Sequence, residues 1–363
     1  MINVAQVTED LKIGGLQRVI ENITMHLDPQ RFRVLVLCLS RGGEIAEKLI
    51  ANGKDVEILG IKNYHSPLSL IKVARWLRQK RIDIVHTHGY PAGVLGRLAA
   101  IFARVPYIFH HVHSTYLDLN KRNHLIERFL SIFTYKVICC SEGVKGFIME
   151  KEGIPEDKLI VLYNGVPEPE LLDTPDIATL KKELGIPEGF RAIGCVASLA
   201  PHKGHRYLLE AFKKIDNAYL LLIGDGSLRG ELEKMASNYG ISERVIFAGY
   251  KKDVTPYIQL MDIVVLPSSE REGLGISIIE AMALSKPVVA TNIGGIPKVV
   301  NDGHTGILVR PKDSDELAEA INRLLESPEL MRKLGVNGRE RYLKIFNLNQ
   351  MIEKIEELYA GCR

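Results

Sequence analysis

The sequence predicts an α/β protein built from two doubly wound parallel sheets. Two observations lead to this prediction. Strand-like apolar runs alternate with helix-like segments along the whole chain, an order typical of parallel sheets covered by helices on both faces. In addition, a stretch rich in turn-forming residues, Asn164-Gly165-Val166-Pro167-Glu168-Pro169, divides the 363 residues into two halves of ordinary domain size.

The first half contains short apolar runs separated by polar or glycine-containing segments. These runs predict strands at residues 2–7, 34–39, 56–59, 82–86, 107–111, 136–140 and 159–162. Helices are predicted at residues 16–27, 44–51, 68–79, 92–103, 123–134 and 142–151. The first of them follows Gly14-Gly15 and the second is stopped by Asn52-Gly53, as expected from the turn preferences of glycine and asparagine.

The second half repeats this alternation. Strands are predicted at residues 193–197, 219–223, 245–247, 263–266, 287–290 and 306–309, with helices between them and three more at 314–326, 328–343 and 348–359. The last helix has an apolar stripe that predicts packing back onto the first half. We therefore expect two Rossmann-like domains, residues 1–166 and 167–346, that face each other across a ligand-binding cleft, and a C-terminal helix at 347–363.

The composition is that of a soluble globular protein, with 46% hydrophobic and 25% charged residues. No apolar run approaches the roughly 20 residues that span a bilayer. The N-terminal segment lacks the basic leader of a signal peptide. The five cysteines have no metal-ligand spacing, and their odd number in mostly strand-like segments indicates reduced, buried thiols. We therefore expect a cytoplasmic protein.

The charge is unevenly distributed. Residues 1–166 carry 22 lysines and arginines against 16 acidic residues, whereas the whole chain has a net charge of only +3. The basic helix predicted at 68–79 also contains Trp76, the only tryptophan. The charge asymmetry is either chance variation or a sign that this half faces an anionic membrane or a phosphate-bearing acceptor. For the helix there are two interpretations: peripheral contact with an anionic membrane at its inner face, or an ordinary surface helix with Trp76 packed inward. Nothing resembles the aromatic and basic platform of a nucleic-acid-binding protein.

The stretch from Ser268 to Ala283 follows the strand 263–266 and has the most informative chemistry. It contains a loop with Gly273 and Gly275, and then a helix start, an arrangement that offers backbone N–H groups to an anion. Glu272 and Glu280 bracket the loop, and a carboxylate is a hydrogen-bond acceptor suited to sugar hydroxyls. The local chemistry indicates a ligand that has both phosphate and hydroxyl groups.

This stretch resembles the E-x7-E signature of the retaining glycosyltransferases of family 4, which have a GT-B fold. Other segments resemble further motifs of that family in the same order: Gly14-Gly15-Leu16, Asn164-Gly165-Val166, Leu199-Ala200-Pro201-His202-Lys203-Gly204, Gly224-Asp225-Gly226, Gly294-Gly295-Ile296-Pro297 and Asp302-Gly303-His304-Thr305-Gly306. The resemblance covers nearly the whole chain. It implies transfer of a sugar from a nucleotide-sugar on the C-terminal domain to an acceptor mainly on the N-terminal domain.

The resemblance also implies roles for individual residues of the C-terminal half. Lys203 would contact the diphosphate and stabilise the charge of the departing nucleotide. Glu272 would contact the transferred sugar or the reacting centre, and Glu280 the ribose. The Gly273-Leu274-Gly275 backbone would approach the donor.

The family pattern is interrupted at Ser198, where many relatives have an arginine that binds the phosphates with the lysine. Either the Ser198 hydroxyl makes this contact, or another cation replaces the arginine. The candidate cations are Arg206, Arg229 and Arg271.

In the N-terminal half, Gly14 and Gly15 would bring backbone N–H groups near the diphosphate or the acceptor, or serve only as a helix-entry turn. The resemblance places one histidine after the strand 107–111 near the transferred sugar. His113 fits best, but His110 and His111 remain alternatives. Further candidates for acceptor contact are His88 and Tyr90.

We expect no essential metal and no cofactor beyond the nucleotide-sugar substrate. His86 and His88 lack carboxylate or cysteine companions, and Asp313-Ser314-Asp315 is better interpreted as a helix N-cap than as a metal-binding D-x-D motif. The expected function is retaining transfer of a hexosyl group, from a UDP-linked donor to a glycan or lipid-linked acceptor in surface polysaccharide synthesis. Alternatives are a sugar-nucleotide epimerase on a similar scaffold and a non-catalytic nucleotide-sugar-binding protein.

Overall fold

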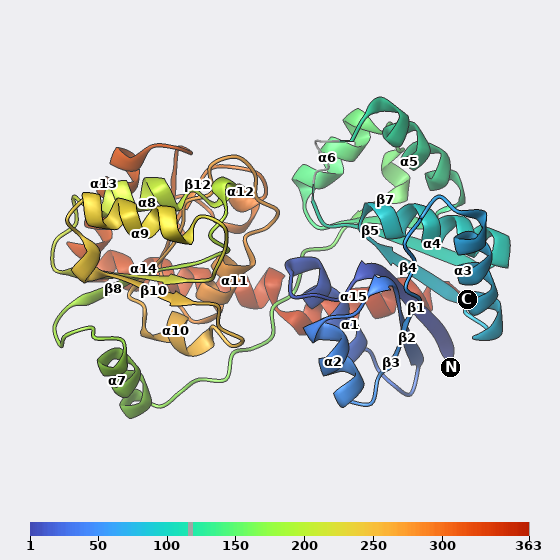
Figure 1. Cartoon of the computed structure of the whole chain (residues 1–363), viewed down its shortest axis with the longest axis horizontal. Coiled ribbons are helices and arrows are strands. Elements are labelled where there is room, and N and C mark those ends of the chain that lie inside the picture. Colours follow the sequence, from blue (N-terminus) through green and yellow to red (C-terminus); the bar gives the residue numbers. More distant parts are fainter. Residues whose placement is uncertain (115–118, 363) are drawn as a thin grey trace. The chain divides into compact units, whose positions relative to one another are not determined.

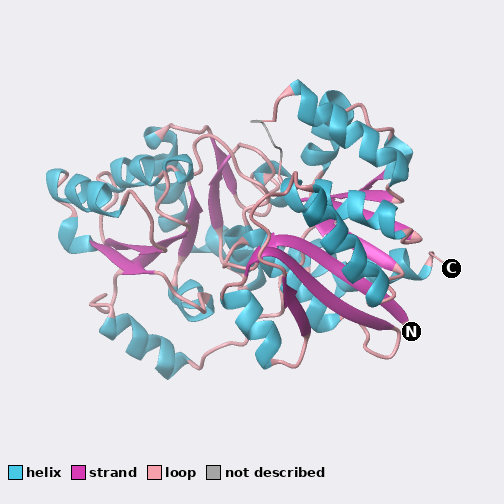
Figure 2. Ribbon diagram, turned by 45° about the vertical axis from the view of Figure 1, so that its right-hand side comes forward, coloured by secondary structure: helices cyan, strands magenta, loops and turns pink. Residues whose placement is uncertain are grey.

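The chain forms two compact units in the computed structural model, which describes residues 1–114 and 119–362 (Figure 1). The N-terminal unit comprises Met1–Gly165 and Leu348–Arg363, and the C-terminal unit comprises Val166–Asn347. The predicted domain boundaries, after residues 166 and 346, each differ from these divisions by one residue. Helices cover both faces of each sheet (Figure 2).

The described part of the N-terminal unit contains a seven-stranded parallel sheet with the order β3-β2-β1-β4-β5-β6-β7. Its strands are β1 (Ile2–Asp10), β2 (Phe32–Arg41), β3 (Asp55–Ile58), β4 (Ile84–His88), β5 (Tyr107–Val112), β6 (Lys136–Cys139) and β7 (Leu159–Val161). Its helices are α1 (Gly15–His26), α2 (Glu44–Ala51), α3 (Pro67–Gln79), α4 (Tyr90–Ala103), α5 (Lys121–Phe133), α6 (Glu142–Lys151) and α15 (Leu348–Ala360).

The described part of the C-terminal unit contains a six-stranded parallel sheet with the order β10-β9-β8-β11-β12-β13. Its strands are β8 (Arg191–Val196), β9 (Ala218–Ile223), β10 (Val245–Gly249), β11 (Ile263–Leu266), β12 (Val288–Thr291) and β13 (Ile307–Val309). Its helices are α7 (Thr174–Glu183), α8 (His205–Phe212), α9 (Arg229–Asn238), α10 (Thr255–Leu260), α11 (Ile276–Ala283), α12 (Ile296–Val299), α13 (Ser314–Leu325) and α14 (Pro328–Arg341). The predicted fold class, two doubly wound parallel sheets, is confirmed.

The C-terminal helix α15 belongs to the core of the N-terminal unit. Its apolar stripe packs against strands of the first sheet, and Tyr359 is fully buried beside Phe32 and Phe109. A short π-helical segment, Tyr342–Phe346, precedes it. The chain therefore enters the N-terminal unit twice, once at its beginning and once at its end.

Trp76 on α3 packs inward. Its side chain is buried in the cluster formed by α3, α4 and the sheet, and its indole Nε1 donates a hydrogen bond of 2.5 Å to Glu57. Of the two interpretations of this basic helix, the structure supports the one in which Trp76 belongs to the core. Within the described residues, none of the helices combines the length and the apolar character required to traverse a bilayer. The five cysteines are buried and unpaired.

Candidate functional site

In each sheet, the direction of strand order reverses once at a pair of neighbouring strands. In the C-terminal unit this happens between β8 and β11, and in the N-terminal unit between β1 and β4. The loops that follow two such strands diverge to opposite faces of the sheet and leave a crevice at the carboxyl ends, where ligands of doubly wound proteins bind. The predicted site residues of the C-terminal unit follow β8 and β11.

The Glu272 carboxylate is the centre of the site in the C-terminal unit. Its Oε2 accepts hydrogen bonds from Lys203 Nζ at 2.6 Å and from Ser268 Oγ at 2.7 Å, and its Oε1 accepts one from the Gly273 N–H at 3.2 Å. The side chains of Glu272 and Lys203 are only 10% and 19% exposed. The structure thus brings together two residues that lie 69 positions apart and that the sequence assigned to separate roles.

Close backbone approaches hold the Glu272 loop in place. A Cβ on Gly204 would lie 1.9 Å from the Pro267 carbonyl oxygen, and one on Gly294 would lie 2.1 Å from the Glu272 carbonyl oxygen. The Gly295 N–H donates to that same carbonyl at 3.1 Å. Ser268, which the sequence analysis did not single out, is also fixed, because its carbonyl accepts from Thr291 Oγ1 at 2.7 Å. These glycines allow three loops to pack on one another.

Substitution of Gly295 by alanine is expected to lower the stability of the C-terminal unit by about 1–3 kcal/mol. The new Cβ would lie 1.8 Å from the Gly273 carbonyl oxygen, so the loop that carries Glu272 must move. The thermal midpoint, followed by circular dichroism, measures the effect. Gly230→Ala is the matched control, since a Cβ there meets nothing within 4 Å on helix α9. An equal midpoint for both variants would contradict the close-packing argument.

The other residues predicted to contact the donor differ in burial and in backbone conformation. Leu274 is buried, so only its backbone is available to a ligand, and Gly275 begins α11 with a positive φ of 68°. Glu280 lies half-buried in the second turn of α11, and Ser198 is exposed in the loop after β8. A donor can therefore meet backbone N–H groups at the start of α11, with Glu280 one turn further along the helix.

Among the three cations proposed to replace the missing arginine, Arg271 directly precedes Glu272 in the chain. Burial lowers the pKa of His202, and the positive charges of Lys203 and Arg271 lower it further, which places both cations near this ring. Arg206 pairs with Glu231 at 2.9 Å, and Arg229 pairs with Glu233 at 2.9 Å. Both carboxylates belong to α9, so these two arginines are engaged away from the Glu272 loop.

Asp313 is the N-cap of α13, as the sequence predicted. Its carboxylate accepts a hydrogen bond of 2.9 Å from the Glu316 N–H, and it also pairs with Arg310 at 2.7 Å. Asp315 pairs with Lys214. Both carboxylates therefore have structural partners.

In the N-terminal unit, Gly14 and Gly15 lie at the start of α1, at the end of the loop that follows β1. Gly14 is extended, with a φ of −174°, and no side chain caps this end of α1. A Cβ on Gly15 would meet nothing within 4 Å. The uncapped first turn of α1 can present its N–H groups to an anion, but the backbone itself does not require glycine at these positions.

Five histidines gather at the carboxyl ends of β4 and β5. The strand register separates the three alternatives for the sugar-facing histidine. His110 and His111 are buried on opposite faces of the sheet, whereas His113 lies just beyond β5 and is only partly buried. Of these three, His113 is the one whose position allows contact with a ligand at the strand ends.

A hydrogen-bonded chain fixes the protonation of His113. Gln6 Nε2 donates to the Tyr359 hydroxyl at 3.0 Å, and Gln6 Oε1 contacts His88 Nε2 at 2.6 Å. His88 must therefore donate from Nε2 and accept at Nδ1, where His113 Nε2 lies at 3.0 Å. His113 consequently carries its proton on Nε2 and leaves Nδ1 as an acceptor. Gln6 and Tyr359 could not be assigned this role from the sequence, because each is a single polar residue within an otherwise apolar strand or helix pattern.

The ring nitrogens of His86, His88 and His111 lie within 4.8 Å of one another, so the structure supplies the companion histidine that the sequence did not reveal. The rings are stacked, with the centroids of His86 and His88 4.3 Å apart. Both nitrogens of His88 are already hydrogen-bonded, and His86 Nδ1 contacts the Tyr359 hydroxyl at 2.6 Å. Hydrogen bonds therefore already occupy both ring nitrogens of His88 and one of His86. The absence of an essential metal stays a prediction.

The histidine cluster is expected to make the N-terminal unit sensitive to acid. Burial lowers the pKa of His86 and of His113 to about 3, and that of His111 well below its usual value. Unfolded histidines take up protons below a pKa of about 6.5. Since the unfolded state then binds more protons, the free energy of unfolding is highest above that pH and falls as the pH drops toward 3.

The variant His111→Leu tests this pH dependence without removing a hydrogen bond, because neither ring nitrogen of His111 has a partner among the described residues. Urea unfolding is followed through the fluorescence of Trp76, the only tryptophan, which lies in the core of this unit. The variant should lose less stability than the parent between neutral and mildly acidic pH. Equal losses would show that His111 takes up its proton in the folded state.

Comparison with known proteins assigns this fold to the GT-B glycosyltransferases. Anabaena HepE, solved in complex with UDP, superimposes with a TM-score of 0.90 at 24% identity, covering 99% of this chain and all of that chain. The putative glycosyltransferase EpsD of Bacillus subtilis is 31% identical over 77% of this chain and 76% of its own length.

A further relative is the Escherichia coli UDP-Gal:alpha-D-GlcNAc-diphosphoundecaprenol alpha-1,3-galactosyltransferase. It is 27% identical over 99% of this chain and 96% of its own length. Residues 13–168 match the model of glycosyltransferase family 4, and residues 176–341 match that of the group 1 glycosyl transferases. The chain belongs to this family of glycosyltransferases, as the resemblance of its motifs predicted.

Proposed function

We propose that this glycosyltransferase moves a hexosyl group from a UDP-linked donor to a lipid-linked glycan acceptor, with retention at the anomeric carbon, in the synthesis of a surface polysaccharide. The observation that carries the proposal is the Lys203–Glu272 pair at the strand ends of the C-terminal unit, 2.6 Å apart and largely buried. The pair places a cation and a hydroxyl-binding carboxylate side by side, the two groups that a sugar diphosphate needs.

The donor is assigned to UDP because of the relatives. Anabaena HepE was solved with UDP, and the Escherichia coli relative is named for UDP-Gal. The same Escherichia coli name includes a diphosphoundecaprenol acceptor, which supports a lipid-linked acceptor here. Glu272 would contact the sugar, Glu280 the ribose, and the backbone at Gly273, Leu274 and Gly275 the diphosphate.

The N-terminal unit would contribute His113 and the turn at Gly14 and Gly15. With its proton held on Nε2 by His88, His113 keeps a lone pair on Nδ1, which is buried and has no hydrogen-bond partner among the described residues, so the ring would have to move before Nδ1 could accept a hydrogen bond from a sugar hydroxyl. The Gly14-Gly15 turn would place N–H groups of α1 near a phosphate. Ser198 and Arg271 would complete the contacts to the donor.

The test is a screen of nucleotide-sugars with a polyprenyl-diphosphate-linked sugar as acceptor. The expected result is release of UDP that rises with acceptor, and a product whose new glycosidic bond has the anomeric configuration of the donor. Donor epimerised without UDP release would favour an epimerase, and binding without turnover would favour a non-catalytic protein; either result contradicts the proposal. Activity that survives treatment with EDTA would support a metal-independent reaction, and its loss would overturn that part.

A further inference from the structure

We propose that the outward face of helix α5, formed by Leu125, Phe129, Ile132 and Phe133, is a docking surface for a bilayer of anionic phospholipids. The side chains are exposed by 65%, 56%, 67% and 48%. Four large apolar side chains so exposed on one helix of 13 residues exceed what scattered surface exposure explains. The proposal concerns a surface outside the candidate active site and does not depend on the identity of the donor.

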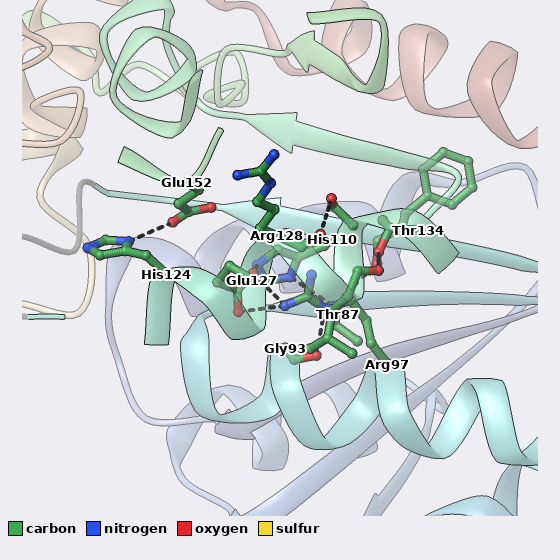
Figure 3. A network of polar contacts seen from close by, with 12 residues as sticks. Thr87, Gly93, Arg97, His110, His124, Glu127, Arg128, Thr134 and Glu152 are labelled. Atoms are coloured by element: carbon green, nitrogen blue, oxygen red, sulfur yellow. Dashed lines mark hydrogen bonds and ion pairs between the residues drawn. The ribbon is translucent and has the colours of Figure 1, made fainter. Parts of the chain in front are cut away.

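The polarity of α5 is inverted relative to an ordinary surface helix, which buries its apolar stripe. Its inward face contains Glu127, whose carboxylate is 4% exposed and binds the Arg97 guanidinium at 2.5 and 2.6 Å (Figure 3). Leu130 and Ser131, three and four positions further on, are buried on the same face. The apolar side chains therefore point away from the unit that the helix belongs to.

The buried ion pair prevents the helix from rolling to hide these side chains. Arg97 belongs to α4, is fully buried, and also donates from Nε to the Gly93 carbonyl at 2.8 Å. Turning α5 outward would leave this guanidinium without its carboxylate in the interior, at a cost of about 3–5 kcal/mol. The exposure of Phe129 and its neighbours is thus imposed by the fold.

The charged side chains on the outward face of α5 are all positive. At 100° per residue, the four apolar side chains fall within an arc of about 100°, with Arg122 inside it and Lys121 and Arg128 about 20° and about 40° outside it. Glu127, the only acidic residue of α5, is buried. In the described part of the chain, Arg122 and Arg128 form no ion pair with a carboxylate.

A hollow of about 710 Å³ continues this surface. It is lined by apolar side chains of α5, including Leu125 and Phe129, and by two cations, Arg128 and Lys158. A hollow with apolar walls and two cations fits a lipid whose phosphate meets the cations while its glycerol and acyl region contacts the aromatic ring.

The mixture of charge and apolar area favours a bilayer over a protein partner. Cores of protein interfaces are depleted of charged residues, whereas helices that lie in the plane of a membrane carry arginine and lysine beside leucine and phenylalanine. A second copy of this chain would bring the same cations face to face. The anionic bilayer supplies the complementary charge.

Cosedimentation of the full chain with vesicles tests the proposal. One set contains phosphatidylcholine alone, and the other contains phosphatidylcholine with phosphatidylglycerol. The parent is expected to bind the anionic vesicles, and the double variant Phe129→Ser/Ile132→Ser to bind them about tenfold less. The variant Arg122→Ser/Arg128→Ser should lose binding to anionic vesicles in proportion to their charge.

The matched control is Leu68→Ser/Ile71→Ser on α3, where the side chains are exposed by 77% and 61% beside Lys72 and Arg75. This variant should bind as the parent does. The emission of Trp76 and the thermal midpoint confirm that each variant is folded. Unchanged binding of the α5 variants, or loss of binding only in the α3 variant, would overturn the proposal. So would a parent dimer that the α5 variant converts to monomer without any vesicle binding.

Discussion

Replacing Lys203 with alanine is expected to lower kcat/KM by about 10²–10³-fold. The departing nucleoside diphosphate gains negative charge in the transition state, and Lys203 Nζ, anchored 2.6 Å from Glu272, is a cation at the strand ends of the C-terminal unit that can stabilise it. Acceptor-dependent release of UDP measures the effect. Lys214→Ala is the matched control, because Lys214 is an exposed lysine of the same unit that pairs with Asp315.

The pairing adds a second expectation, because Lys203→Ala also leaves the Glu272 carboxylate, 10% exposed, without its cation. Glu272→Gln alone should cost at least about tenfold, since the neutral amide keeps its place but not its charge. If the two side chains act as one unit, the double variant will lose less than the product of the single losses. Parental turnover in both single variants would remove these residues from the active site.

Glu127→Gln is expected to lower the free energy of unfolding of the N-terminal unit by about 3–5 kcal/mol. The change leaves the fully buried Arg97 guanidinium without a counter-charge. Urea unfolding followed by Trp76 fluorescence measures the loss. Asp55→Asn is the control, because it breaks the exposed pair with Arg33 in the same sheet and should cost at most about 1 kcal/mol.

A companion double variant separates the effect of the two charges from the effect of side-chain volume. Arg97→Met/Glu127→Leu removes both charges and keeps apolar volume, so it should recover most of the stability that Glu127→Gln loses. If Glu127→Gln proves as mild as Asp55→Asn, the ion pair does not hold α5 in its orientation. The exposure of Phe129 and its neighbours would then have another cause than this ion pair.

The fold was largely predictable because its signals are local. Apolar runs such as Ile263–Leu266 mark buried parallel strands, and turn residues after them mark the strand ends where ligands bind. That information, with the order of the family motifs, led to the candidates Glu272, Lys203 and His113, whose roles stay predictions. The N-cap role of Asp313 followed from the same kind of local pattern.

The contacts that organise the candidate site were not predictable, because they join positions distant in sequence. Lys203 meets Glu272 across two loops, and the chain that sets the protonation of His113 includes Gln6 and Tyr359, which are 353 positions apart. The sequence also does not show that α5 exposes its apolar side chains and buries Glu127. An apolar pattern shows which residues share a face of a helix, and it does not show which face a buried ion pair such as Arg97–Glu127 draws inward.

The place of helix α15 has a consequence for how the chain is made. Residues 166–347 form one continuous unit, which can complete its own core as soon as that segment has left the ribosome. The N-terminal unit is synthesised first, but Leu348, Ile355 and Tyr359 fill the core beneath its sheet. It must therefore wait, with that face uncovered, until residues 348–360 have been synthesised. The half of the protein that begins first is the half that finishes folding last.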